Sequence, residues 1–107
     1  MSDEQKVPVK HYNELVKMFP EFMSTLEKLG GTVRDAGPLD EKTAELIQLG
    51  ASATLQSEGA VHSHTRRAVQ AGASKEEIYH SLILLVSTIG FPRVSAAISW
   101  ARDILNK

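Results

Sequence analysis

The stretch ELIQLGASATLQSEGAVHSH, residues 45–64, decides the fold. Its pattern predicts two helices that meet at a short polar corner, QSEG at residues 56–59. At about 100° per residue, four polar side chains of the first helix share one sector roughly 80° wide on an otherwise apolar segment. These four are Glu45, Gln48, Ser52 and Gln56. The second helix places His64 on its apolar side. We therefore expect a catalytic site, where the protein has one, to lie in this stretch.

Upstream of this stretch the apolar spacing predicts two further helices. One begins near Val9 and ends at Phe19, because the proline that follows disfavours the helical conformation in the residue before it. The next starts at Pro20 and is expected to stop at the glycine pair GG, residues 30–31. After a connecting loop, Asp40 is a good N-cap for the helix that carries Glu45.

Downstream, three more helices are expected and no segment has the pattern of a strand. Ser57 can cap a helix that runs to Gly72. The sequence SKEE at residues 74–77 is a capping box and opens a central apolar helix that ends at Gly90. Pro92 then begins a last helix, in which Trp100 lies off the inward stripe and is a candidate contact between subunits.

Composition indicates one domain over residues 1–107, with residues 1–7 as a flexible tail and the core in residues 39–107. Twelve basic and 13 acidic side chains leave no basic patch, so a nucleic-acid partner is not expected. The N-terminus lacks the apolar region of a signal peptide and no apolar run is long enough for a membrane span, so a cytoplasmic protein is expected. With no cysteine, every thiol-based mechanism is excluded.

A metal site is not expected from the spacing of the histidines. His62 and His64 are about 200° apart on a helix, so their rings cannot close on one ion. His62 is expected on the solvent side of that helix. A site formed by His80, His64 and Glu45 has no supporting spacing.

Three segments in this order resemble the carboxymuconolactone decarboxylase family, which includes the alkylhydroperoxidase D-like proteins. They are LDEKTAELIQLGASATLQ at residues 39–56, SEGAVHSH at 57–64 and AVQAGASKEEIYHSLILLVSTIGFP at 68–92. The resemblance implies an all-α fold, an alkylhydroperoxidase D-like orthogonal bundle of about six helices. It also implies a homo-oligomer, with trimers and hexamers the usual assemblies.

In the peroxidase branch of that family, a glutamate and a histidine flank a CxxC motif. Glu45 and His64 occupy the glutamate and histidine positions, whereas Ser57 and Ala60 stand at the cysteine positions. Neither serine nor alanine can cycle through a disulfide. The chain therefore resembles a member lacking CxxC, and the peroxiredoxin activity attached to the family does not carry over.

In the decarboxylase branch the corner resembles Arg-Glu-Gly-Glu, of which Ser57-Glu58-Gly59-Ala60 keeps the glutamate and glycine. This implies a cofactor-free carboxy-lyase acting on a carboxylated lactone or related small acid. His64 would deliver the proton after carbon dioxide departs, and Glu45 would orient its ring. Ser57, Glu58 and Arg67 are the candidate substrate-binding residues, with Arg66 and Arg93 as further cations.

Each of these residues also has a structural interpretation. His64 can be a core histidine, Glu45 a polar group paired with a neighbouring helix, and the arginines solvated surface residues. In this interpretation Ser57 is the N-cap of its helix and binds no substrate, and Glu58 complements the helix dipole. The alternative function is accordingly a non-catalytic or ligand-binding oligomer that has lost its redox cysteines.

Overall fold

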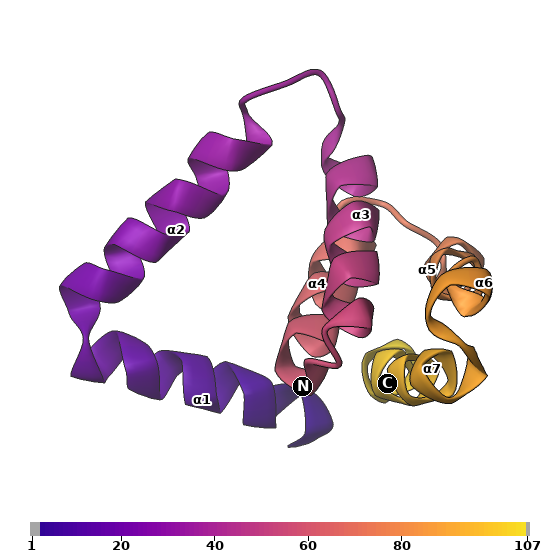
Figure 1. The fold of residues 1–107 in the computed structure, drawn as a ribbon. Coiled ribbons are helices and arrows are strands. Elements are labelled where there is room, and N and C mark those ends of the chain that lie inside the picture. The colour runs from indigo at the N-terminus through magenta and orange to yellow at the C-terminus, as the bar shows by residue number, and fades with distance from the viewer. Residues whose placement is uncertain (1–2, 107) are drawn as a thin grey trace. The chain divides into compact units, whose positions relative to one another are not determined.

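The computed structural model describes residues 3–106, with side chains from residue 9 onward. It divides into two compact units, Met1–Asp40 and Glu41–Lys107, and each is described by itself. The described residues form seven helical segments and no strand, and one of the seven, α6, is a single turn (Figure 1). The all-α class expected from the sequence is confirmed. None of the helices has the length and apolar character needed to cross a membrane.

The first unit consists of two helices, α1 (Asp3–Met18) and α2 (Pro20–Arg34). They meet at Phe19, as the Phe19-Pro20 pair predicts. Helix α1 begins at Asp3, so residues 3–7, expected as a tail, are helical, while residues 1–2 lie outside the described part. The expectation came from missing apolar periodicity, which identifies a buried face and not the end of a helix.

The predicted stop at Gly30 and Gly31 is wrong, because α2 continues to Arg34. Neither glycine has a positive φ, and the Asp35 N–H donates to the Gly31 carbonyl at 3.0 Å, which keeps the helical pattern intact. Glycine inside a helix costs about 1 kcal/mol relative to alanine, which weakens a helix without ending it.

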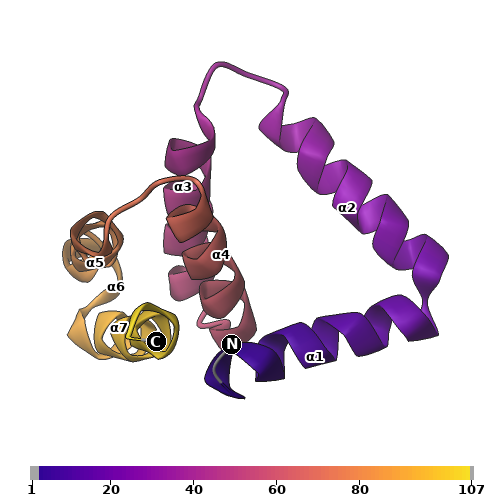
Figure 2. The same cartoon turned by 180° about the vertical axis from the view of Figure 1, so that it is seen from behind.

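The second unit carries α3 (Glu41–Thr54), α4 (Glu58–Gln70), α5 (Lys75–Ile83), α6 (Val86–Ile89) and α7 (Phe91–Leu105). Helices α3 and α4 lie side by side in both views, while α5 and α7 are seen almost end-on (Figures 1 and 2). The two pairs therefore cross, which gives the orthogonal bundle expected. Small residues at the crossings let the backbones approach closely; the fully buried ones include Ala53, Ala68, Ala97 and Ala101.

The corner between α3 and α4 spans residues 55–57 and is tightly defined. Gln56 has φ 57°, the left-handed conformation that a residue with a Cβ rarely adopts. The Ser57 hydroxyl then accepts from the Ala60 N–H at 3.3 Å, which confirms the predicted N-cap of α4. The chain thus reverses within three residues and returns α4 along α3.

The central helix expected from Ser74 to Gly90 is interrupted. The capping box is present, with Ser74 and Glu77 satisfying each other's backbone amides at 3.0 and 2.9 Å. Helix α5 ends at Ile83, however, and the Leu85 N–H donates to the Leu82 carbonyl three residues back, a tighter turn than the α-helical one. The break falls at Leu84 and Leu85, two apolar residues that continue the pattern, so apolar periodicity alone overestimated the length of the helix.

We predict that Glu77→Gln reduces stability most at neutral pH. The Ser74 backbone N–H and the Lys42 ammonium of α3 both hold the pKa of the Glu77 carboxyl below its ordinary value. A depressed pKa stabilises the fold above the unfolded-state pKa, and this contribution is lost as the pH falls through the folded-state pKa. The loss of melting temperature should therefore be clear at pH 7 and shrink as the pH falls below the ordinary range of a glutamate pKa.

The control for this comparison is Glu76→Gln, one residue earlier in the same first turn. It removes the same charge from the helix N-terminus but no recorded hydrogen bond of the described residues. An equal loss for both variants at every pH would show that the dipole, and not the cap and ion pair, sets the effect.

Candidate functional site

A histidine–glutamate pair joins the two helices that the corner sets side by side. His64 of α4 and Glu45 of α3 are 2.8 Å apart, from Nδ1 to Oε1. The Glu45 side chain is only 3% exposed and that of His64 is 19% exposed. The structure thus brings together the two residues named from the sequence as the catalytic candidates. Their role in catalysis stays a prediction.

The geometry of this pair suits proton transfer. A proton on Nδ1 would donate to Oε1 of the buried Glu45 side chain, a contact that holds the ring in one orientation. Among the described residues, the other ring nitrogen, Nε2, has no recorded hydrogen-bond partner. A ring that is anchored through one nitrogen and partly exposed can accept or deliver a proton at the other.

Among the described residues, the rest of the polar stripe on α3 has no recorded hydrogen bond to this pair. The Ser52 hydroxyl donates to the Gln48 carbonyl one turn back, at 2.8 Å. Gln56 is exposed at the corner. Ser57 uses its hydroxyl as the α4 cap, so of its two interpretations the structural one describes the contact that is observed.

The candidate substrate cations differ in their surroundings. Arg67 is exposed one turn beyond His64 on α4, and Arg93 is exposed at the start of α7. Arg66 is half-buried, and its Nη1 has no hydrogen-bond partner within the described part of the chain. Burial lowers the pKa of the Arg66 guanidinium, and the neighbouring charge of Arg67 lowers it further. Arg67 is therefore the cation on α4 that an acidic substrate could reach without displacing protein contacts.

The sequence-based placement of His62 on the solvent side is wrong. Its side chain is 11% exposed, and Nε2 lies 2.9 Å from Oδ2 of Asp103 on α7. Helix α4 is covered by α3 on one side and by α7 on another, so His62 is buried although Glu58, one turn earlier on the same face, is exposed. Two rings about 200° apart on α4 thus each meet a carboxylate from a different helix.

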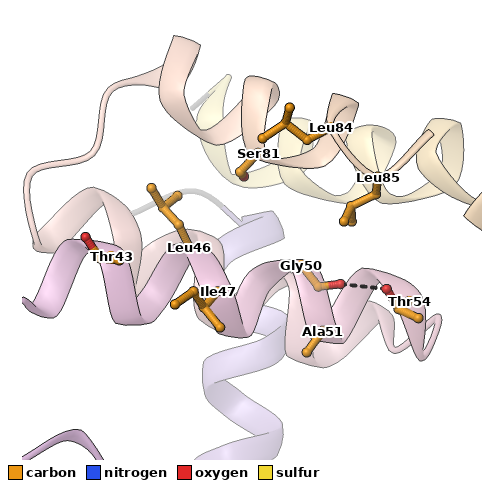
Figure 3. Close-up of a pocket in the computed structure, with 9 residues that line it drawn as sticks. All are labelled: Thr43, Leu46, Ile47, Gly50, Ala51, Thr54, Ser81, Leu84 and Leu85. Carbon is orange, nitrogen blue, oxygen red and sulfur yellow. Dashed lines mark hydrogen bonds between the residues drawn. The ribbon is translucent and has the colours of Figure 1, made fainter. Parts of the chain in front are cut away.

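An apolar pocket lies on the other side of α3, against α5 (Figure 3). It has a volume of about 480 Å³ and is lined by Leu46, Ile47, Gly50, Leu84 and Leu85, with Thr43, Ala51, Thr54 and Ser81 at its edges. The Thr54 hydroxyl donates a hydrogen bond to the Gly50 carbonyl oxygen, as Figure 3 shows. Neither His64 nor Glu45 lines the pocket, so it is separate from the histidine–glutamate pair.

Comparisons with known proteins agree on one family. The model of the carboxymuconolactone decarboxylase family matches residues 20–103. An uncharacterized protein of Methanocaldococcus jannaschii is 33% identical over 92 residues, 86% of each chain. An uncharacterized protein of Haemophilus influenzae is 33% identical over 59 residues, 55% of this chain and 52% of that protein.

A solved structure has the same fold along almost the whole chain. It is the apo crystal structure of a carboxymuconolactone decarboxylase family protein from Legionella pneumophila. The TM-score is 0.80 at 25% identity, and the match covers 97% of this chain and 95% of the other. The similarity thus includes the helices that carry Glu45 and His64.

We predict that neutral His64 carries its proton on Nδ1, because the Glu45 carboxylate accepts there. Nitrogen-15 NMR of the imidazole should show this tautomer in the wild type and in Glu45→Gln, whose amide oxygen still accepts. In Glu45→Leu the acceptor is gone and the proton should move to Nε2. A wild-type ring protonated on Nε2 would contradict the arrangement described.

Proposed function

Because the chain belongs to the carboxymuconolactone decarboxylase family, we propose that it is a cofactor-free carboxy-lyase acting on a carboxylated lactone or related small acid. The observation that supports this most directly is the contact of 2.8 Å between His64 and the buried Glu45. It is an acid–base pair with one ring nitrogen anchored and the other without a recorded partner in the described chain.

In the proposed reaction the C–C bond to the carboxylate breaks and carbon dioxide leaves. The electron pair flows into the adjoining unsaturated lactone and forms an enolate. The imidazolium of His64 gives its Nε2 proton to carbon, and the Glu45 carboxylate stabilises the ring in its charged form. A proton from solvent then restores His64. No electron is transferred to an acceptor, which is consistent with a chain without cysteine.

The proposed substrate contacts are weaker than this pair. Arg67 provides an exposed positive charge one turn from His64, suited to the substrate carboxylate. Glu58 and Ser57 lie at the corner that begins α4, where the Ser57 hydroxyl already serves the cap. We therefore expect Arg67 to affect binding more than Ser57.

We predict that His64→Ala lowers kcat on carboxymuconolactone by about 10²- to 10⁴-fold, the usual contribution of a general acid. Carbon dioxide release, followed by a coupled assay, measures it. His80→Ala, which removes an exposed histidine of α5, is the matched control and should retain full activity. Unchanged turnover in His64→Ala would exclude the proposed proton donor.

The second candidate is a non-catalytic oligomer that binds an apolar ligand. The observation that favours it is the pocket between α3 and α5. This pocket is largely apolar, and neither His64 nor Glu45 is among the residues that line it. This function predicts no turnover of any carboxylated lactone by the wild type. It also predicts ligand affinity that falls when Gly50→Leu fills the pocket and is unchanged in His64→Ala.

We also propose that the chain forms a homo-oligomer through a second copy of itself. Within the first unit, α2 carries an exposed apolar stripe with helical spacing, formed by Phe22, Leu26, Leu29 and Val33. A row of large apolar side chains at this spacing exceeds the scattered exposure usual for a monomer. Such a stripe supports burial against another protein surface.

The expected assembly is a trimer or hexamer at micromolar concentration, measured by light scattering. Replacing Leu26 and Leu29 by glutamate should dissociate it, because charges at the centre of an apolar interface lose their hydration. Ser24→Glu, on the opposite face of α2, is the control and should leave the assembly intact. A monomeric wild type would contradict the proposal.

A further inference from the structure

Three metal-ligating side chains converge at the contact of α4 with α7. Glu58 and His62 are four residues apart, one turn of α4, and Asp103 comes from α7. One ligand atom from each residue lies within 4.8 Å of the other two. The imidazole Nε2 faces this group, since it contacts Oδ2 of Asp103 at 2.9 Å.

The charges of this group are unbalanced. Among the described residues, neither Glu58 nor Asp103 forms an ion pair with a lysine or an arginine, and Glu58 has no recorded hydrogen-bond partner. Two carboxylates near each other repel, and the only polar contact recorded for either of them among the described residues is that of Asp103 with the His62 imidazole. A cation placed among the three ligand atoms would remove this repulsion.

We propose that Glu58, His62 and Asp103 bind a divalent first-row transition metal ion such as Zn²⁺ or Mn²⁺. One imidazole nitrogen with two carboxylate oxygens is a borderline donor set, which suits these ions better than Mg²⁺ or Ca²⁺. Ligand atoms of a tetrahedral zinc site are roughly 3.4 Å apart, as bonds of about 2.1 Å require. To reach it, Nε2 of His62 and Oδ2 of Asp103, now 2.9 Å apart, would separate slightly, and the exposed Glu58 carboxylate would move toward them.

The burial pattern fits a site that holds its metal at the surface. The His62 ring is 11% exposed and is fixed between two helices, whereas the Asp103 side chain is 44% exposed and Glu58 is exposed. The ion therefore has an entry path and keeps coordination positions for water. It would link the first turn of α4 to α7, so metal binding should stabilise the crossing of these helices.

Zinc titration of the apo protein, purified without a polyhistidine tag, tests this site by calorimetry. The wild type should bind one equivalent per chain. Glu58→Gln should weaken Zn²⁺ binding at least tenfold, while Glu41→Gln should leave it unchanged. Both substitutions remove an exposed carboxylate from the first turn of a helix, α4 and α3 respectively, so the helix-dipole effect is matched.

Asp103→Asn should weaken binding to a similar extent, with circular dichroism checking that the variant folds. The outcome that overturns the proposal is equal zinc affinity in the wild type and Glu58→Gln.

Histidine NMR separates this site from the His64–Glu45 pair. The chain has four histidines, so their imidazole signals can be assigned individually. Zn²⁺ should shift the His62 signals at the first equivalent, and Mn²⁺ should broaden them before those of His11, His64 and His80. Zinc that shifts His64 while leaving His62 unchanged would overturn the assignment. Neither the calorimetry nor the NMR measurement depends on catalytic turnover by the His64–Glu45 pair.

Discussion

Burial of α4 between α3 and α7 is the constraint on which the rest of the second unit depends. A helix covered on two sides loses stability for each polar side chain that it turns inward without a partner, because an unpaired buried group costs about 1–3 kcal/mol. His62 and His64 both face inward, and each is paired with a carboxylate from the helix that covers it. The polar chemistry of the protein is thus gathered along one helix, on two opposite faces.

Most of the fold could be predicted because local signals agreed with the tertiary structure. The Ser57 cap, the SKEE capping box and the Gly90 and Pro92 boundary each act within a few residues, and each lies where expected. The errors came at helix ends that neither a glycine nor apolar periodicity alone determines. The helix runs through Gly30 and Gly31, and α5 stops at Ile83 although its apolar pattern continues.

In the candidate site, likewise, some contacts could be predicted from the sequence and others could not. Glu45 and His64 were named together because they match the glutamate and histidine positions of the family that the sequence resembles, and the short corner between their helices brings them into contact across 19 residues. The contact of His62 could not be predicted, since its partner Asp103 lies 41 residues away on a helix whose position no local pattern reveals. Periodicity assigned His62 to solvent because it measures apolarity, and a polar face buried against a polar partner has none.

The corner at residues 55–57 also determines the rotational phase of α4 relative to α3. If the corner keeps its three residues, each residue inserted at the start of α4 would turn the part of the helix that follows by about 100°. Two insertions would bring His62 close to the direction in which His64 now points, so that the ring facing Glu45 would change while the helix stayed buried. The left-handed Gln56 and the Ser57 cap hold the corner at three residues. In the history of such a fold, an insertion in α4 ahead of His62 is therefore a change in which histidine meets which acid.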